Sequence, residues 1–443
     1  MIRSRQASRH ISISVEKRRR AAAAWVEAVV VATEKHRWGR LGSISLAAMA
    51  LPGVMLETAI AQEMPTEGIV AYKQFHYSEE QPAPPNSVRE FGRAPQAWSA
   101  RDLAGRSGSA DAISGASGAG TDGRRVRVSS PSLYVLAPFG GHWAAQGSFT
   151  RDSVSGATPQ YYSDMRGARQ MQEVRNALDA KISRFWPRSS LSVGTARSEE
   201  NDYISQAFSA QTTQSSEDQN TVWNLGVGLT RDRINPANER VVDERRQTLE
   251  LELGVTYVWS SKDVFQLNLA SSRARGYLSD PYKLSDRRPR QRDANTGIIR
   301  WNRWLGSSAL KSSYRYYADS YGIRSHTIEL GLATPMLRHL TLTPSLRYYS
   351  QNSADFFGGP GLDGFPAPPP APKLFSADQR LAAFGALTAG LKIEWQVDQL
   401  WLIDYKLEKY RQQSNWALPS QRTTFSLDRL DAIFWQFGIS RRF

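Results

Sequence analysis

Six aspartates stand at comparable places in the chain, each a few residues from the end of an alternating hydrophobic segment. They are Asp152, Asp202, Asp232, Asp280, Asp319 and Asp355, and Glu199, Glu200 and His326 lie in similar positions. Carboxylate oxygens suit hard cations such as Ca²⁺ or Mg²⁺, and a histidine would also admit Zn²⁺ or iron. If the segments are strands of one closed sheet, their ends form a ring. The sequence therefore predicts a cation or ligand site at its rim, with the metal left unknown.

A simpler interpretation of these aspartates exists. Strand ends need polar capping, and aspartate is a favoured turn residue. Turn formation explains the same spacing without any ligand, so both interpretations stay open at this point.

The stretch "YRYYADSYGIRSHTIEL" (residues 314–330) raises the question of serine–histidine catalysis. Ser325 directly precedes His326, and adjacent strand residues point to opposite faces of a sheet. These two residues therefore cannot act as nucleophile and base together. No nucleotide-binding loop or HExxH zinc motif is present, and we predict that the protein is not an enzyme.

The segments that carry these residues alternate with a period of two. In residues 249–254, Leu249, Leu251 and Leu253 alternate with Glu250, Glu252 and Gly254. Such runs reach ten to thirteen residues, which is roughly twice the usual length of a strand in soluble proteins. A tilted strand of this length is long enough to span a bilayer. Tryptophan and tyrosine gather near their ends, as in the aromatic girdles of membrane barrels.

The sequence predicts an all-β fold, a transmembrane antiparallel up-and-down β-barrel of about 16 strands. Connections alternate between short and long, which is typical of short periplasmic turns and long external loops. We expect flexible loops near residues 79–127 and 353–380, and a bulge at Pro344. The strands are predicted to begin near Gly68, Val128, His142, Val174, Leu191, Asp202, Thr221, Gln247, Lys262, Asn295, Ser308, Arg324, His339, Leu381, Asp398 and Leu430.

Both ends of the chain carry export signals. Residues 1–61 resemble a signal peptide with an extended n-region: "RWGR" precedes the apolar "LGSISLAAMALPGVML" and the small-residue site "AIA". Residues 62–443 then form a single barrel domain. The terminal strand "IFWQFGISRRF" ends at Phe443, the form of signal that the barrel assembly machinery recognises, although Arg441 replaces an apolar residue. These features predict the outer membrane of a Gram-negative bacterium.

Composition narrows the partners. The chain has 443 residues, a net charge of +14 and no cysteine, which excludes disulfides, thiolate metal sites and cysteine nucleophiles. Residues 1–61 hold ten Lys/Arg and four Asp/Glu, so their removal leaves a net charge of +8. No basic run interleaves with stacking aromatics, so we predict no nucleic-acid partner. A mildly basic surface suits outer-membrane lipid and lipopolysaccharide.

The polar face of the predicted strands carries charges of both signs. A barrel of this size can enclose an aqueous channel. These charged side chains would either line that channel or form ion pairs with one another across it. No cofactor is evident in the sequence, although the rim acids allow a divalent cation. No plug domain of the size used by gated siderophore receptors precedes the barrel, which disfavours that class. The predicted lumen charges are Glu250, Glu252, Arg315, Arg347, Lys392 and Glu394.

The chain resembles an uncharacterised bacterial family, domain of unknown function 3570. The resemblance rests on phrases such as "SFTRDSVSGATPQYYSD", "SEENDYIS", "DRINP", "GYLSDPYK" and "YRYYADSYGIRSHT". It implies an outer-membrane barrel with no established activity. It also implies a link to periplasmic redox, flavin or metal-handling components, including a lipoprotein.

Two functions follow from the sequence. The first is a pore or transport channel for small hydrophilic solutes or ions, with an acidic external rim. The second is a non-channel scaffold that partners a periplasmic redox, flavin or metal-handling pathway at the outer membrane.

Overall fold

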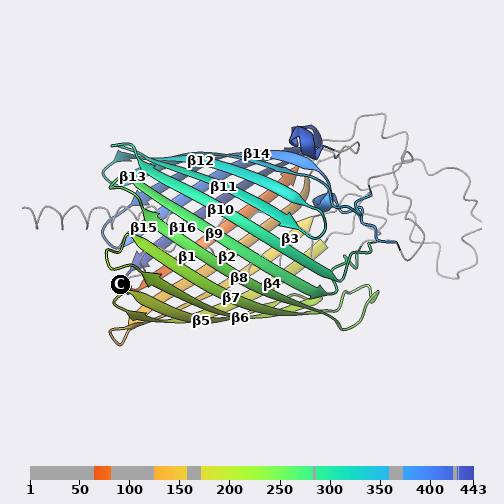
Figure 1. Cartoon of the computed structure of the whole chain (residues 1–443), viewed down its shortest axis with the longest axis horizontal. Helices are drawn as coiled ribbons and strands as arrows, with labels where there is room; N and C mark the ends of the chain where they lie inside the picture. Colours follow the sequence, from red (N-terminus) through yellow and green to blue (C-terminus); the bar gives the residue numbers. More distant parts are fainter. Residues whose placement is uncertain are drawn as a thin grey trace, which may run out of the picture.

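The computed structural model describes residues 64–80, 124–156, 171–282, 286–358, 373–422, 427 and 429–443. The predicted signal peptide, residues 1–61, lies outside these ranges, as does most of the loop near residues 79–127. Sixteen antiparallel strands close into one barrel, which confirms the predicted fold (Figure 1). The predicted starts all fall within four residues of the observed ones.

The strands are β1 (Ile69–Glu80), β2 (Arg124–Phe139), β3 (Trp143–Gly156), β4 (Met171–Trp186), β5 (Ser189–Glu199), β6 (Tyr203–Ser215), β7 (Thr221–Ile234), β8 (Glu244–Val258), β9 (Asp263–Gly276), β10 (Gln291–Trp304), β11 (Ala309–Asp319), β12 (Arg324–Leu337), β13 (Leu340–Gln351), β14 (Phe384–Gln396), β15 (Trp401–Gln413) and β16 (Leu430–Arg442). In the part of the chain that the structure describes, three short 3-10 helices accompany them: η4 (Gln379–Leu381), η5 (Ser414–Trp416) and η6 (Pro419–Gln421). Within the described ranges, no helix has the length and hydrophobicity needed to span a bilayer.

The first and last strands close the sheet. β1 pairs with β16 from Ile69 opposite Arg442 to the far end of both strands. Gly68 and Phe443 extend the pairing, because each donates its backbone N–H to the carbonyl of the other at 2.8 and 3.0 Å. Both described ends of the chain therefore lie at the same end of the barrel, and the sheet has no free edge.

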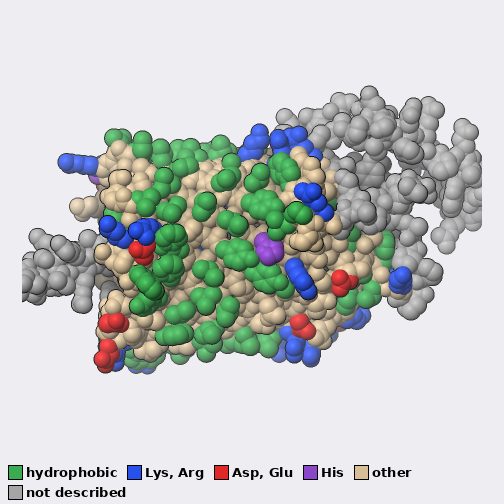
Figure 2. All heavy atoms as spheres, turned by 45° about the horizontal axis from the view of Figure 1, so that its top comes forward, with side chains coloured by type: hydrophobic (Ala, Val, Ile, Leu, Met, Phe, Trp, Pro, Cys, Tyr) green, Lys and Arg blue, Asp and Glu red, His purple; other side chains and the backbone are tan. Residues whose placement is uncertain are grey.

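The two faces of the sheet differ in chemistry. On the outer face, Leu225 and Leu251 are 56% and 51% exposed, whereas their inward neighbours Asn224 and Glu252 are nearly fully buried. Hydrophobic side chains cover the middle of the outer surface, and charged side chains gather toward its ends (Figure 2). Soluble proteins rarely expose apolar surface on this scale, so the natural solvent of this face is lipid.

Aromatic side chains form an outward band at the end of the barrel with short turns. Arg441, which departs from the usual terminal pattern, lies over the Trp401 ring at 5.5 Å. The band supplies amphipathic rings at the level where hydrocarbon meets water. It includes Trp186, Trp223, Tyr257, Phe265, Trp395 and Trp401.

One local expectation was wrong. The register of β12 against β13 is the same on both sides of Pro344, although the ladder skips the pairs Leu332–Pro344 and Ala333–Thr343, and the bulge-like irregularity lies instead between Pro335 and Leu337. The loop near residues 353–380 was expected to be flexible. Its described parts are packed, with Ala354 and Asp378 fully or almost fully buried. Residues 359–372 of this loop lie outside the described ranges.

The outward position of Leu251 gives a test of the membrane orientation. Leu251 lies at the middle of β8, whereas Tyr257 lies outward near its short-turn end. We expect Leu251→Arg to lower the free energy of unfolding in lipid vesicles by about 2–4 kcal/mol, and Tyr257→Arg by about 0–1 kcal/mol. Denaturant titration of both variants measures the difference. Equal losses would contradict the assigned lipid-facing band.

Candidate functional site

The predicted rim acids lie at the long-loop end of the barrel, but arginines neutralise most of them. Asp152 pairs with Arg175, which stands directly opposite it on β4. Asp232 lies opposite Arg246 on β8, whose Nε donates to it at 2.6 Å. Both pairs point inward and their carboxylates are almost fully buried. Each is a cross-strand ion pair that stabilises the inner wall.

The same holds for two further acids. Asp319 accepts from Nε of Arg292 at 2.9 Å and from the Tyr317 hydroxyl at 2.7 Å. Its other oxygen caps the turn to β12 by accepting from the backbone N–H of Tyr321 at 3.0 Å. Asp280 pairs with Arg380 at 3.2 Å. For these aspartates the capping and pairing interpretation accounts for the contacts.

Two predicted members of the ring stand apart from it. His326 lies on the outer face of β12, where its Nδ1 is 2.8 Å from the Tyr314 hydroxyl. The preceding residue, Ser325, is buried on the inner face, as strand alternation requires. Asp355 is exposed in the loop after β13. The structure therefore does not bring His326 together with the inward acids.

Three other carboxyls do come together. Glu173 near the start of β4 and Glu200 and Asp202 in the tight turn between β5 and β6 each place an oxygen within 4.8 Å of the other two. We call these three residues the carboxylate cluster. The turn is fixed by backbone bonds: Glu200 N–H donates to Tyr203 O, and Asn235 N–H to Asp202 O, both at 2.8 Å.

The carboxylate cluster is buried but poorly satisfied. Glu200 is 6% and Asp202 9% exposed. Three of the carboxylate oxygens, both of Glu200 and Oδ1 of Asp202, accept no hydrogen bond from any N–H or hydroxyl group in the described part of the chain. The Tyr282 hydroxyl donates to the other oxygen of Asp202. Buried carboxylates are costly without partners, so this arrangement calls for a proton or a cation.

Burial, and after it the negative charge of Glu173, raise the pKa of Glu200 to about 9, although the positive charge of Arg175 opposes the shift. The pKa of the Tyr282 phenol is also raised, first by burial and then by its bond to Asp202, so it remains a donor. At neutral pH without a cation, Glu200 therefore carries a proton that it can share with Glu173. A divalent cation bound to the three oxygens would displace that proton.

Loops that cross the mouth hold Tyr282 in place. The segment between β9 and β10 forms a backbone bridge to the segment before β14: Arg287 N–H donates to Phe375 O at 2.7 Å, and Phe375 N–H returns the bond at 3.0 Å. Arg288 and Arg380 both bind Asp378, which is inaccessible to solvent. We call residues 277–282, 286–290 and 373–383 the mouth bridge.

The mouth bridge also contacts the side of the barrel that holds the carboxylate cluster. Asn238, between β7 and β8, donates to Pro281 O at 2.9 Å, and the Tyr282 hydroxyl accepts from Ala237 N–H at 3.2 Å. The bridge thus links the carboxylate cluster to the loop after β13. The mouth bridge therefore narrows the opening of the barrel at its long-loop end.

Deeper in the barrel, inward charges are paired along the wall. Arg347 binds Glu329 at 2.9 Å and approaches Glu408 at 3.9 Å, and Lys392 binds Glu394 at 2.8 Å. Glu252 accepts from Asn268 at 3.2 Å. The other predicted lumen charges, Glu250 and Arg315, also lie on inward positions of their strands.

Sequence reasoning missed Glu173 and the arginine partners of the rim acids. Arg175 and Arg246 each follow a long connection, and no turn of known length fixes their register against the preceding strand. Glu200 was included among the rim acids but not distinguished from them. Its position beside Asp202 in a short turn was the available signal.

No curated protein matches the chain. Solved structures with a similar fold include the siderophore receptor PirA from Pseudomonas aeruginosa, with 8% identity and a TM-score of 0.42 over 84% of this chain and 62% of that one. A bacterial polysaccharide outer membrane secretin has 9% identity and a TM-score of 0.44 over 84% of this chain and 98% of that one. CdiB from Acinetobacter baumannii has 7% identity and a TM-score of 0.44 over 84% and 60%. The chain spans less than two thirds of PirA and of CdiB.

The phrases quoted above from the sequence fall within a match to one family model, which covers residues 41–427. This match covers well over half of the chain and confirms the resemblance. The chain belongs to the family described as protein of unknown function (DUF3570).

Proposed function

We propose that this protein is an outer-membrane channel for small hydrophilic solutes or ions that binds a divalent cation at its external mouth. The carboxylate cluster carries the proposal, because both oxygens of Glu200 and one oxygen of Asp202 are buried without a donor, while the other inward rim aspartates are neutralised by arginines. Three carboxylates supply the hard oxygen ligands that Ca²⁺ or Mg²⁺ prefers, and water would complete the coordination.

The position of the carboxylate cluster supports a role in passage. Glu173, Glu200 and Asp202 lie on the inner side of the wall, beside the mouth bridge. A cation there would fix the β5–β6 turn and, through Asp202 and Tyr282, the bridge itself. Removal of the cation would leave three neighbouring carboxyls to share protons or repel each other, which would loosen the mouth.

Orientation follows from the connections. Long loops at one end and short turns at the other are typical of outer-membrane barrels whose long loops face outward. We therefore assign the carboxylate cluster to the external side and the closure of β1 with β16 near Phe443 to the periplasmic side. The assembly machinery would recognise this terminal strand, and Gram-negative bacteria provide the membrane.

Calcium binding by the carboxylate cluster is the first test. We expect the purified barrel in detergent to bind one Ca²⁺ per chain in isothermal titration. Glu200→Gln and Asp202→Asn should each weaken binding at least about tenfold, because each removes a charged ligand. Asp355→Asn is the matched control, an exposed acid at the same end, and should bind normally. Normal binding by both cluster variants would contradict the proposal.

The protonation of Glu200 predicts the pH dependence of this binding. Because the pKa of Glu200 is raised to about 9, the proton competes with the cation below that pH. Affinity should rise as the pH increases from about 6 toward about 9, and each binding event should release a proton. Titrations in buffers of different ionisation enthalpy measure the release. An affinity that stays constant over this range, with no proton released, would argue against binding at Glu200.

Conductance across planar bilayers tests the channel. Asp378→Ala leaves Arg288 and Arg380 without their shared buried partner, a change that typically costs about 3–5 kcal/mol. We expect wild-type protein to conduct and Asp378→Ala to conduct more, since the mouth bridge would open, with Asp355→Ala unchanged. If neither the wild type nor Asp378→Ala conducts, the channel proposal fails and the scaffold alternative gains support.

A further inference from the structure

Residues 414–422, which begin the connection between β15 and β16, pack against the outside of the barrel. Tyr348 on β13 donates its hydroxyl to Trp416 O at 2.6 Å, and Ser350 accepts from Leu418 N–H at 2.9 Å. Gln421 donates to Arg324 O at 3.0 Å. These contacts hold residues 414–422 against the outer face of β12, β13 and β14.

The close approach of this segment requires a glycine in the wall beneath it. A Cβ added to Gly385 on β14 would clash with the carbonyl group of Trp416. Gly385 lies opposite Ser350 in the ladder, so it shares the outward face with the residues that the segment covers. The residue at position 385 therefore determines whether residues 414–422 can pack this closely against the barrel.

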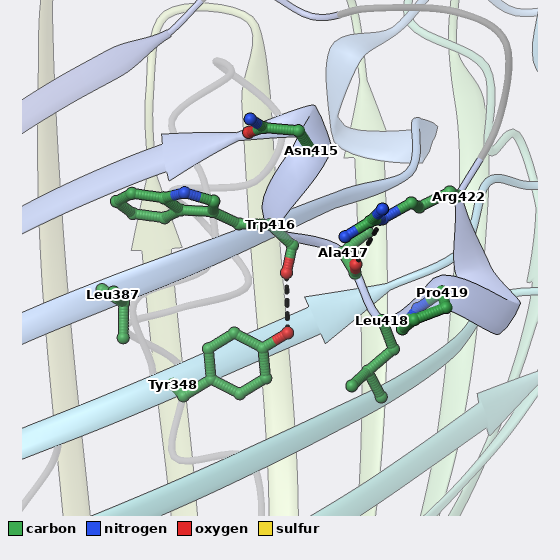
Figure 3. A pocket seen from close by; sticks show the side chains of 8 residues that line it. All are labelled: Tyr348, Leu387, Asn415, Trp416, Ala417, Leu418, Pro419 and Arg422. Carbon is green, nitrogen blue, oxygen red and sulfur yellow. Dashed lines mark hydrogen bonds between the residues drawn. The ribbon is translucent and has the colours of Figure 1, made fainter.

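Between the segment and the wall lies a groove of about 340 Å³ that opens to the outside (Figure 3). Leu387, Leu418 and Pro419 form an apolar part of its lining, Asn415 and Arg422 a polar part, and in Figure 3 the Trp416 ring extends toward Leu387. We call this space the outer groove. Its main lining residues are Tyr348, Leu387, Trp416, Leu418, Pro419 and Arg422.

Arg422 places a positive charge at the outer groove. Its Nε donates to Ala417 O at 3.1 Å, and among the described residues its guanidinium forms no ion pair with a carboxylate. Two terminal nitrogens therefore remain available for an anion with several oxygens. Guanidinium groups suit phosphate because their donors match two of its oxygens at once.

Neighbouring outward residues show the depth of the outer groove in the membrane. Tyr314, Tyr316 and His326 gather on the outer face of β11 and β12 near their long-loop ends, with Tyr314 bonded to His326. Such amphipathic rings lie where hydrocarbon meets head groups. On the same face of β12, Ile328, opposite Tyr314, and Leu330, one step farther from the long-loop end, are exposed. The outer groove, over the adjoining strands at the same end, thus lies at the head-group level.

We propose that the outer groove binds lipopolysaccharide, with an acyl chain of lipid A against its apolar wall and a lipid A phosphate on Arg422. An aliphatic chain fits the side formed by Leu387, Trp416 and Leu418, and the phosphate is complementary to the Arg422 guanidinium, which has no carboxylate partner among the described residues. Lipopolysaccharide is the occupant because the outer groove is at the long-loop end, which faces the external leaflet. This step rests on the proposed orientation but not on channel activity or cation binding.

Native mass spectrometry of the delipidated full-length barrel in detergent, titrated with bisphosphorylated lipid A, tests this proposal. We expect one tightly bound lipid A on the wild type. Arg422→Gln should weaken it about tenfold, as expected for loss of a hydrogen bond to a charged group. Trp416→Ala should weaken it as well. Arg231→Gln is the control, because Arg231 is an exposed arginine on the outer face of β7, away from the outer groove.

Three outcomes would overturn the proposal. One is equal binding of lipid A to the wild type, Arg422→Gln and Trp416→Ala. Another is equal weakening by Arg231→Gln, which would indicate nonspecific attraction to basic surface. The third is displacement of lipid A by an equimolar amount of phosphatidylglycerol, which would assign the outer groove to phospholipid. Retained Ca²⁺ binding in Arg422→Gln would show that the two proposals fail or succeed independently.

Discussion

Closure of the sheet is the constraint on which the rest of this structure depends. A strand edge in hydrocarbon would expose unpaired backbone N–H and carbonyl groups, each at a cost of several kcal/mol. Pairing of β1 with β16, extended by the mutual bonds of Gly68 and Phe443, removes that edge. Closure also fixes which residues face inward. It also brings the ends of distant strands together in one rim. Glu173 lies close to Glu200 and Asp202 because β4, β5 and β6 are neighbouring strands of this sheet.

The rim shows two ways of burying acids. Where a carboxylate faces an arginine on the next strand, as Asp152 faces Arg175, the charges offset each other and the pair stabilises the wall. The carboxylate cluster departs from this pattern, since three acids adjoin each other and Arg175, whose charge acts on Glu200, forms its ion pair with Asp152. An arrangement of this kind costs stability unless a proton or cation compensates it. Retention of such a cost beside rim aspartates that pair with arginines is typical of a functional position.

The sequence predicted the fold because each of its signals is local. Period-two alternation, the lengths of connections and the terminal aromatic residue can all be counted along the chain, and they gave sixteen strands with correct approximate starts. The packing of the described parts of residues 353–380 was not visible in the sequence, because the burial of Asp378 depends on Arg288, ninety residues earlier. Composition could not reveal that contact.

The candidate site was predictable only in outline. Inward acids at strand ends were visible, but their separation into paired and unpaired groups depends on register across long connections, as between Asp232 and Arg246. His326 was grouped with the acids by position along the strand, although it lies on the opposite face from Ser325, which points inward. Strand alternation, which places Ser325 and His326 on opposite faces, could also have shown that His326 cannot join a site on the inner face.

The most direct test of the central claim is a crystal structure of the full-length barrel with Mn²⁺, an anomalous scatterer that accepts the same oxygen ligands as Mg²⁺ and Ca²⁺. The account predicts one strong anomalous peak within bonding distance of carboxylate oxygens from Glu173, Glu200 and Asp202. The account would be contradicted if crystals in which these three residues are well ordered showed no anomalous peak there, or showed peaks only elsewhere.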